Sequence, residues 1–394
     1  MNNVIILGAG RIGRGFLARL LHEDGRDPVF FAATDATVQR LHGKTYEIHV
    51  LGAEEKNVLL ETEVQAFSVR DTEALASQWA RTELIFTACG GKNLEALGGE
   101  LAKAFQLLRS MGKAHVSNIV TCENWKAPEK VLKEAICGHL TQEERADFER
   151  LTGVTESAVM CSGTGAPEPS ALHHPMDTWV EDVLYLPVNA KGMKGELPQL
   201  SCIEFLPDFG SLLRQKLYTR NTSIATIGYL GRLKGLTYVA EAAADPEIAP
   251  ILDELYREVS EILVQSLGID REKQRVFAER ADAKNRNPLI IDPLTRIGRD
   301  PIRKLSPEDR LIGPLREGAA LGLSTDAIAL GCAAALYYED PEDETACRLA
   351  ELRREKGTDY ILKEICGLDP AGEEAKRIRR AQERLKEKGW IQKL

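Results

Sequence analysis

Several features typical of membrane, zinc-binding and disulfide-stabilised proteins are missing from this sequence. No run approaches the roughly 18 to 20 apolar residues that a membrane-spanning helix needs. The eight cysteines stand singly and form no Cys-x-x-Cys pair, which argues against a zinc motif and against a disulfide framework. The first residues lead directly into an apolar run, without the basic start of a signal peptide. We therefore expect a soluble, cytoplasmic protein with no membrane segment and no metal.

Positive charge does not predominate, because 60 acidic residues outnumber 51 lysines and arginines, and histidine is missing from the second half. The formal net charge is −9, which argues against a nucleic-acid-binding protein because such proteins depend on a cationic surface. All seven histidines lie within the first 174 residues: His22, His42, His49, His115, His139, His173 and His174. A proton acceptor in the second half would therefore be a lysine, tyrosine, aspartate or glutamate.

A chain of 394 residues is too long for one compact core, and its pattern changes near residue 190. The first part alternates short apolar runs with amphipathic helical stretches, which is typical of an α/β fold with a parallel sheet. The clearest predicted strands are Val4–Leu7, Val29–Ala33, Leu84–Ala88 and Ser117–Thr121. Residues 207–270 and 310–392 have helical spacing instead. We predict an α/β domain over 1–190 and a mainly α-helical domain over 191–394.

The turn after the first apolar run is rich in glycine. Gly8-Ala9-Gly10-Arg11-Ile12-Gly13 matches the G-x-G-x-x-G pattern between a predicted strand and a predicted helix. In dinucleotide-binding folds the first glycine makes the tight turn, the second lets the backbone approach a pyrophosphate, and the third packs the helix against the strand. The alternative is a tight turn without a ligand. The context favours a Rossmann doubly wound parallel sheet that binds a nicotinamide dinucleotide at Gly8, Gly10, Arg11, Ile12 and Gly13.

The residue that would bind the ribose of the dinucleotide is less clearly marked. The second predicted strand ends in Phe30-Phe31-Ala32-Ala33-Thr34-Asp35, so that small residues stand where a carboxylate usually follows the strand. Asp35 comes slightly later and would favour NAD. Arg40 could instead help to accommodate the 2′-phosphate of NADP. We expect NAD, and the sequence leaves NADP open.

A basic run in the second half is the strongest indication of an anionic substrate. Five cations fall within fifteen residues: Arg296, Arg299, Arg303, Lys304 and Arg310. Gly298, Pro301 and Pro307 interrupt them, which predicts a shaped loop. Arginine binds phosphate with two parallel hydrogen bonds, and we predict that Arg303 and Lys304 bind a substrate phosphate. The alternative is a set of ion pairs to the acidic residues of the same run.

Several motifs, in order along almost the whole chain, resemble one enzyme family. They are Gly8–Phe16, Tyr46–Gly52, Thr121–Asn124, Lys216–Thr222, Tyr229–Gly231 and Arg296–Ile312. The sequence resembles the mannitol-1-phosphate 5-dehydrogenases, a group within the polyol-specific long-chain dehydrogenases, or mannitol dehydrogenase family. The last motif is similar to the phosphate-using branch. The resemblance implies an NAD(P)-dependent, metal-independent hydride transfer between a polyol phosphate and a ketose phosphate, such as mannitol 1-phosphate and fructose 6-phosphate.

The resemblance also implies the residues that perform this reaction. By position, Lys216 corresponds to the general base, and Asn221 and Asn124 correspond to asparagines that hold the substrate oxygen. Burial and the nearby Arg220 would lower the pKa of Lys216. On a regular α-helix, Asn221 would lie about 140° around the axis from Lys216. The expected partner is a small sugar or polyol phosphate, and the expected assembly is a monomer or a small homo-oligomer.

Two positions depart from the family pattern. Ile224 stands where family members usually carry a histidine, eight residues after the lysine. Residues 159–165 lack the Asp-Arg-Ile sequence expected there. Two alternatives therefore stay open: a dehydrogenase of an unphosphorylated polyol or sugar acid, and a dinucleotide-binding protein that has lost catalysis.

Overall fold

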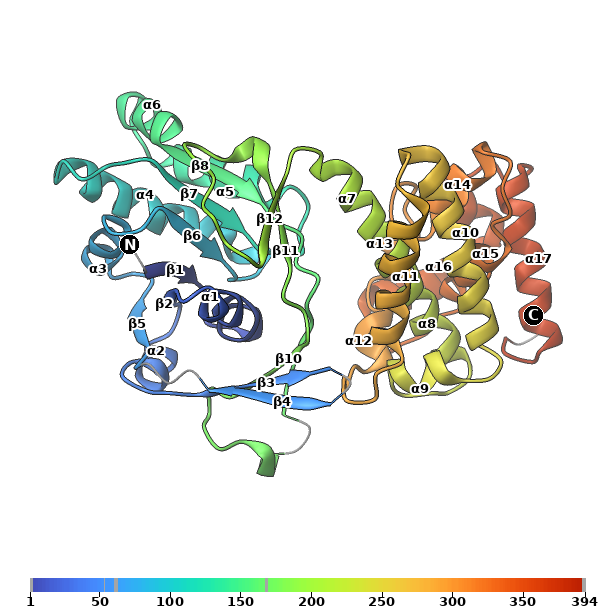
Figure 1. Ribbon diagram of the computed structural model, residues 1–394. Helices are drawn as coiled ribbons and strands as arrows, with labels where there is room; N and C mark the ends of the chain where they lie inside the picture. The colour runs from blue at the N-terminus through green and yellow to red at the C-terminus, as the bar shows by residue number, and fades with distance from the viewer. Residues whose placement is uncertain (1–2, 53, 60–62, 167–168, 392–394) are drawn as a thin grey trace. The chain divides into compact units, whose positions relative to one another are not determined.

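The computed structural model describes residues 3–52, 54–59, 63–166 and 169–391. The chain divides into two compact units, Met1–Phe209 and Gly210–Leu394, which we call the sheet unit and the helical unit. Strands and helices alternate in the sheet unit, whereas the helical unit consists of helices and connecting loops throughout its described residues (Figure 1).

The sheet unit is built on a six-stranded parallel sheet in the order β5-β2-β1-β6-β7-β8. The bounds are β1 Asn3–Leu7, β2 Asp27–Ala32, β5 Gln65–Ser68, β6 Leu84–Thr87, β7 Ser117–Thr121 and β8 Thr152–Glu156. The chain starts in the middle of the sheet, runs outward on one side and then continues on the other side. The strand order therefore reverses between β1 and β6, and ligands of such sheets bind outside the carboxyl ends of the strands at that point.

Alternating side chains of the strands fill two hydrophobic cores, one on each face of the sheet. In β1, Val4 and Ile6 belong to one core, and Ile5 and Leu7 belong to the other. Strands that are buried on both faces require an almost continuous apolar run, which is why these segments could be predicted from the sequence. Helices cover the sheet: η1 Ile12–Leu17, α1 Ala18–Glu23, α2 Asp35–Leu41, α3 Thr72–Trp79, η2 Gly91–Asn93, α4 Leu94–Ser110, α5 Pro128–Gly138 and α6 Gln142–Leu151.

The sheet unit also contains a second, smaller sheet with the strand order β4-β3-β10-β9. Its strands are β3 Glu47–Leu51, β4 Glu55–Leu59, β9 Gly163–Thr164 and β10 Thr178–Glu181. It contacts the first helical turn closely, because a Cβ atom at Gly15 would lie 2.5 Å from Val180 Cγ1. The remaining elements are the short helices η3 Pro169–Ala171 and η4 Ala190–Gly192, and a two-stranded parallel pair, β11 Leu186–Asn189 and β12 Ile203–Leu206.

The helical unit surrounds one hydrophobic core. Its helices are α7 Phe209–Lys216, η5 Leu217–Asn221, α8 Thr222–Leu233, α9 Val239–Ala244, α10 Ala249–Leu267, α11 Arg271–Asn285, α12 Leu294–Gly298, α13 Pro301–Lys304, α14 Ile312–Ala320, α15 Asp326–Leu336, α16 Glu344–Glu364 and α17 Glu373–Glu387. Every residue of α15 from Ala327 to Leu336 is buried. This helix has eleven residues, and none of the helices within the described ranges is both long and apolar enough to cross a membrane.

Two contacts explain how so apolar a helix is held. A Cβ atom at Gly331 would lie 2.3 Å from Thr226 Oγ1, so that α15 and α8 approach each other closely at this glycine. At the start of α15, the buried Glu258 carboxylate accepts hydrogen bonds from the backbone N–H groups of Ala327 and Ile328, each at 3.1 Å. The predicted architecture, a Rossmann sheet followed by a mainly helical part, is confirmed.

Candidate active site

The glycine turn has the geometry that a dinucleotide-binding site requires. Gly8 has a φ of +118°, and a Cβ atom there would lie 2.5 Å from the Ala88 carbonyl oxygen, so only glycine fits between β1 and β6. A Cβ atom at Gly13 would lie 2.0 Å from the Gly8 oxygen, which fixes the helix close to the strand. At Gly10 the nearest atom would be 3.9 Å away, so the space beside this backbone is open. Gly8 and Gly13 thus keep the turn tight, and Gly10 leaves room for a ligand such as a pyrophosphate beside its backbone.

The helix after this turn is wound as a π-helix over Ile12–Leu17. The backbone N–H of Ala18 donates to the Gly13 oxygen, five residues back. Arg14 ties the turn to the segment just before β10, since its Nε donates to the Met176 oxygen at 2.8 Å. Arg11 is exposed and packs its Cβ against Gly163. Such π-turns are rare and occur frequently at functional sites.

Asp35 lies three residues after the carboxyl end of β2. It is the first residue of α2, and Thr34 caps this helix through its hydroxyl oxygen. The Asp35 side chain is exposed at the carboxyl end of β2. Arg40, in the last turn of the same helix, is exposed as well. Both residues considered for the choice between NAD and NADP are therefore accessible in the structure.

Asn124 follows β7 at the carboxyl edge of the sheet and is exposed. Its neighbour Glu123 is buried and organises this edge. Thr87 Oγ1 donates to Glu123 Oε2 at 2.6 Å, and the backbone N–H of Cys89 donates to Glu123 Oε1 at 3.0 Å. Burial and the Glu123 carboxylate raise the pKa of the Cys89 thiol to about 12. The sequence did not indicate that Glu123 joins the ends of β6 and β7, because it was noted there only as part of the motif Thr121–Asn124.

Lys216 is the last residue of α7 and is partly exposed. Burial of its stem and ammonium group lowers its pKa to about 8, and repulsion by Arg220, Lys284 and Arg310 acts in the same direction. Among the residues that the structure describes, none forms a hydrogen bond or an ion pair with this ammonium group. Lys216 is therefore a cation with a lowered pKa and without a carboxylate partner. Lys284, on α11, is far away in the sequence, which gave no indication that it lies near this site.

Asn221 lies on a π-helix, Leu217–Asn221, that directly follows Lys216. The backbone N–H of Thr222 donates to the Leu217 oxygen, five residues back. A turn that bonds residue i to i+5 brings positions five residues apart closer to one face than a regular α-helix does. The offset of about 140° that a regular α-helix would give between Lys216 and Asn221 therefore does not apply to this turn. Ile224 begins the next turn and packs against the core of the helical unit.

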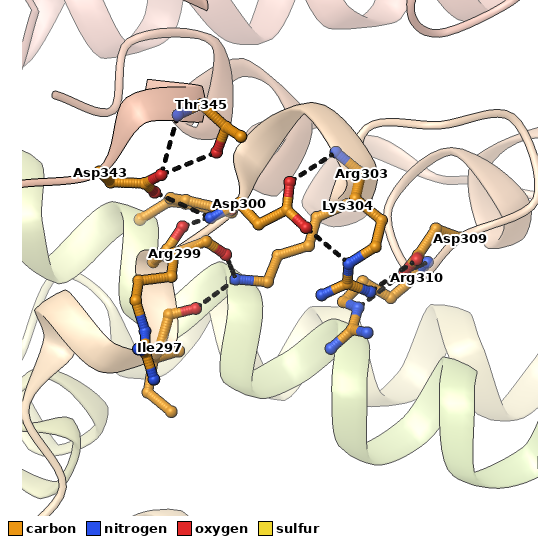
Figure 2. Close-up of polar contacts among 11 residues, drawn as sticks. Ile297, Arg299, Asp300, Arg303, Lys304, Asp309, Arg310, Asp343 and Thr345 are labelled. Carbon is orange, nitrogen blue, oxygen red and sulfur yellow. Dashed lines mark hydrogen bonds and ion pairs between the residues drawn. The ribbon is translucent and has the colours of Figure 1, made fainter. Parts of the chain in front are cut away.

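The basic run forms a network of ion pairs and carbonyl contacts (Figure 2). Arg303 Nε donates to Asp300 Oδ2 at 2.8 Å, and its Nη1 donates to Asp309 Oδ2 at 3.1 Å. The other oxygen of Asp309 accepts from Arg310 Nε at 2.7 Å. Asp309 thus bridges the two arginines. The ion pairs that we considered as the alternative to phosphate binding are present, and the Arg303 side chain is still 51% exposed.

Lys304 points inward. Only 5% of its surface is exposed, and its ammonium group donates to the backbone carbonyl oxygens of Ile297 and Arg299 (Figure 2). The Tyr229 ring lies 5.6 Å from the same nitrogen. Burial, followed by repulsion from Arg310, lowers the pKa of Lys304 to about 7. Lys304 therefore holds the loop between α12 and α13 together, and its contact with a substrate phosphate stays a prediction.

Each unit brings together part of the predicted residues. In the sheet unit, the glycine turn, Asp35 and Asn124 all lie at the carboxyl ends of the parallel strands. In the helical unit, Lys216 and Asn221 lie on consecutive turns beside further cations. No cluster of three or more His, Cys, Asp or Glu side chains that could hold a metal ion occurs in the part of the chain that is described.

Comparison with known proteins assigns both units to one family. The mannitol dehydrogenase Rossmann domain matches residues 2–201, and the mannitol dehydrogenase C-terminal domain matches residues 209–367. A mannitol-1-phosphate 5-dehydrogenase of Bacillus pumilus (strain SAFR-032) is 32% identical over 365 residues, which is 92% of this chain and 95% of that protein.

Two solved structures share the fold. One is the Pseudomonas fluorescens mannitol 2-dehydrogenase ternary complex with NAD and D-mannitol, with a TM-score of 0.74 and 17% identity over 99% of this chain and 92% of that one. The other is a D-sorbitol dehydrogenase in substrate-free form, with a TM-score of 0.80 and 15% identity over 98% of this chain and 93% of that one. The family expected from the motifs is confirmed: this chain belongs to the mannitol dehydrogenase family.

Proposed function

We propose that the chain is an NAD-dependent oxidoreductase that interconverts a polyol phosphate and a ketose phosphate. The proposal depends mainly on the environment of Lys216, whose pKa is lowered to about 8 and whose ammonium group has no anionic partner among the described residues. The Bacillus pumilus relative, named as a mannitol-1-phosphate 5-dehydrogenase, supports a phosphorylated substrate of the mannitol 1-phosphate and fructose 6-phosphate type.

The glycine turn would hold the dinucleotide. The open space beside Gly10 would admit the pyrophosphate, and the N-terminus of η1, with Arg11 and Ile12, would face its charge. Gly8 and Gly13 keep the turn tight, and Asp35 would bind the ribose hydroxyls, which favours NAD. The nicotinamide supplies the acceptor for a hydride from the substrate carbon.

Lys216 would act as the general base without help from a metal. A base works best when its pKa is near the working pH, because it is then often unprotonated and still basic enough to accept a proton. Burial and three neighbouring cations bring the pKa of Lys216 into this range. The Lys216 nitrogen would take the proton of the substrate hydroxyl, and the amide group of Asn221 would hold the same oxygen. This assigns the proton transfer to the histidine-free helical unit. The role that the family resemblance implies for Asn124 stays a prediction.

Arg303 would bind the substrate phosphate. Its Nε and Nη1 are bonded to aspartates, whereas no described residue accepts from its Nη2, and half of the side chain is exposed. Arg310 adds positive charge beside it, and the buried Lys304 does so in its protonated form. In this proposal Lys304 acts on the phosphate mainly through its charge, since its ammonium group is bonded to backbone oxygens.

A steady-state rate panel tests this proposal. Purified protein is assayed with mannitol 1-phosphate, fructose 6-phosphate, free mannitol and a sugar acid, each with the matching form of NAD and of NADP. Turnover with the phosphate esters alone is the expected result. Turnover with free polyols or sugar acids would replace the proposed substrate class. NADH binding without turnover on any of these substrates would favour a protein that has lost catalysis, for which Ile224 in place of the usual histidine is the supporting feature.

A further inference from the structure

Trp125 is the most exposed large apolar side chain in the described part of the protein, with 53% of its surface accessible. Exposing an indole ring to water is unfavourable, and aromatic residues that remain accessible beside a ligand-binding edge are candidates for ligand contacts. Trp125 directly follows Asn124 and thus lies at the carboxyl edge of the parallel sheet. Nothing in the proposed function uses this residue.

The indole ring rests on a glycine. A Cβ atom at Gly91 would lie 2.2 Å from Trp125 Cδ2 and 2.4 Å from its Cε3 and Cγ, so that any side chain at position 91 would displace the ring. Gly91 begins η2, the short turn between β6 and α4. One face of the indole is therefore covered by the backbone of this turn, and much of the rest of the ring is left accessible.

The turn under the ring is fixed by hydrogen bonds. Glu123 accepts from the backbone N–H of Cys89 at 3.0 Å, and Asn93 Nδ2 donates to the Cys89 oxygen at 2.6 Å. The preceding residue, Ala88, is the one whose carbonyl oxygen requires glycine at position 8. The support of Trp125 is thus continuous with the glycine turn that would hold the pyrophosphate.

The position of Trp125 within the sheet indicates which part of a dinucleotide would lie beside its ring. In a doubly wound sheet, each half binds one mononucleotide, and the glycine turn with the ribose-binding carboxylate belongs to the half formed by β1, β2 and β5. Trp125 and Gly91 belong to the other half, formed by β6, β7 and β8. That half is left for the nicotinamide mononucleotide.

We propose that Trp125, seated on Gly91, forms an aromatic wall of the nicotinamide half of the dinucleotide site. The inference rests on the proposed function in requiring that the chain binds NAD. Planar rings bind one another by offset stacking or edge-to-face contacts, and the accessible part of the indole offers either contact to the nicotinamide riboside. Removing the ring removes this contact, while the exposed position leaves the hydrophobic core intact.

The experiment compares the wild type with four variants. NADH binding to each protein is measured by calorimetry and by energy transfer from tryptophan to NADH. We expect Trp125→Ala to weaken NADH binding about tenfold, or about 1.4 kcal/mol, with an unchanged melting temperature. Trp125→Phe should retain most of the affinity because it keeps an aromatic ring, but it should lose a large part of the energy transfer. Gly91→Ala should weaken binding by displacing the ring. Val116→Ala is the matched control, since Val116 is 42% exposed and precedes the amino end of the same strand, β7.

The outcomes separate this inference from the function on which it rests. Wild-type affinity in Trp125→Ala and in Gly91→Ala would overturn the aromatic wall and leave the dehydrogenase proposal standing. Equal weakening by Val116→Ala would overturn it as well, because the effect would not depend on the carboxyl edge. Failure of the wild-type protein to bind NADH would overturn both proposals together.

Discussion

The sheet unit and the helical unit each contain a π-helical turn at their candidate site residues, but the two turns offer a ligand different groups. In the sheet unit, η1 follows Gly8 and Gly10 and contains Gly13, and the surface offered to a ligand is backbone. In the helical unit, η5 follows Lys216 and carries Arg220, and the surface offered is positively charged side chains. The first candidate site depends on the absence of side chains at its glycines, and the second depends on the Lys216 ammonium group, which has no carboxylate partner among the described residues.

This difference determines how each site can be damaged. Adding a single carbon atom to the glycine turn fills space that a ligand or a neighbouring carbonyl needs. Adding atoms near Lys216 matters less than removing its charge or its basicity. The two units therefore differ in which substitution is severe, and four predictions test that contrast.

The largest effect is expected for Lys216→Ala. Loss of a general base typically costs about 10²–10⁴-fold in rate, so turnover should be nearly abolished, while NADH affinity should stay close to that of the wild type. In the wild type, kcat/KM for polyol oxidation should rise with pH and level off above about 8, because Lys216 must be unprotonated to accept a proton. Lys363→Ala, an exposed lysine on α16, is the control. Retained turnover in Lys216→Ala would remove this residue as the base.

The next effect concerns the glycine turn. Gly10→Ala should weaken NADH binding more than about tenfold with little loss of stability, because its Cβ atom would enter open space near the proposed pyrophosphate. Gly13→Ala should instead lower the melting temperature, because its Cβ atom would collide with the Gly8 oxygen at 2.0 Å. Gly138→Ala, with no atom within 4 Å of the new carbon, is the control. Unchanged NADH affinity in Gly10→Ala would mean that the turn serves the fold alone.

A smaller effect is expected for Arg303→Ala. Loss of a charged hydrogen bond costs about 1.5–3 kcal/mol, so KM for the phosphate ester should rise well above tenfold, with kcat and NADH affinity less affected. Arg348→Ala removes an exposed, ion-paired arginine from α16 and should leave KM unchanged. An unchanged KM in Arg303→Ala would reassign the basic run to the structure of its loop.

The smallest effect is a gain in stability for Lys216→Met. The folded-state pKa of Lys216, about 8, lies below the ordinary value of 10.5, so folding disfavours its charged form. This penalty is fully present below pH 8 and disappears as the pH rises past 10.5, because the unfolded chain then loses the same proton. Lys216→Met should therefore be more stable than the wild type at pH 7, and this gain should shrink at high pH. Urea titrations at both pH values measure this difference, and a gain that does not depend on pH would contradict it.

Much of the fold could be predicted from the sequence because its signals are local. Strands buried on both faces need unbroken apolar runs, and β7 begins and ends at the predicted residues, Ser117–Thr121. The smaller sheet was missed, since its two hairpin-like pairs, β3 with β4 and β9 with β10, are joined by a pairing of β3 with β10 across more than a hundred residues. Its parallel pair, β3 and β10, has no short-range signature.

The candidate site was predictable in its residue types but not in its details. The sequence indicated cations in the basic run, but it could not tell that Lys304 is buried and that Arg303 is half exposed. That distinction depends on how the loop folds around the carbonyl oxygens of Ile297 and Arg299. The two π-turns were also missed, because winding of this kind follows from the packing of the whole helix rather than from residue preference.

The π-turn at Leu217–Asn221 has a consequence for changes in chain length. A turn closed from residue i to i+5 holds one residue more than a turn of α-helix, so it absorbs a surplus residue without rotating the helix that follows. Shortening the chain by one residue here would convert the turn to regular winding and leave α8 facing its core. The same deletion inside α8 would turn every later side chain by about 100°. A one-residue deletion is therefore tolerated by the framework at the very place where it would alter the spacing of Lys216 and Asn221.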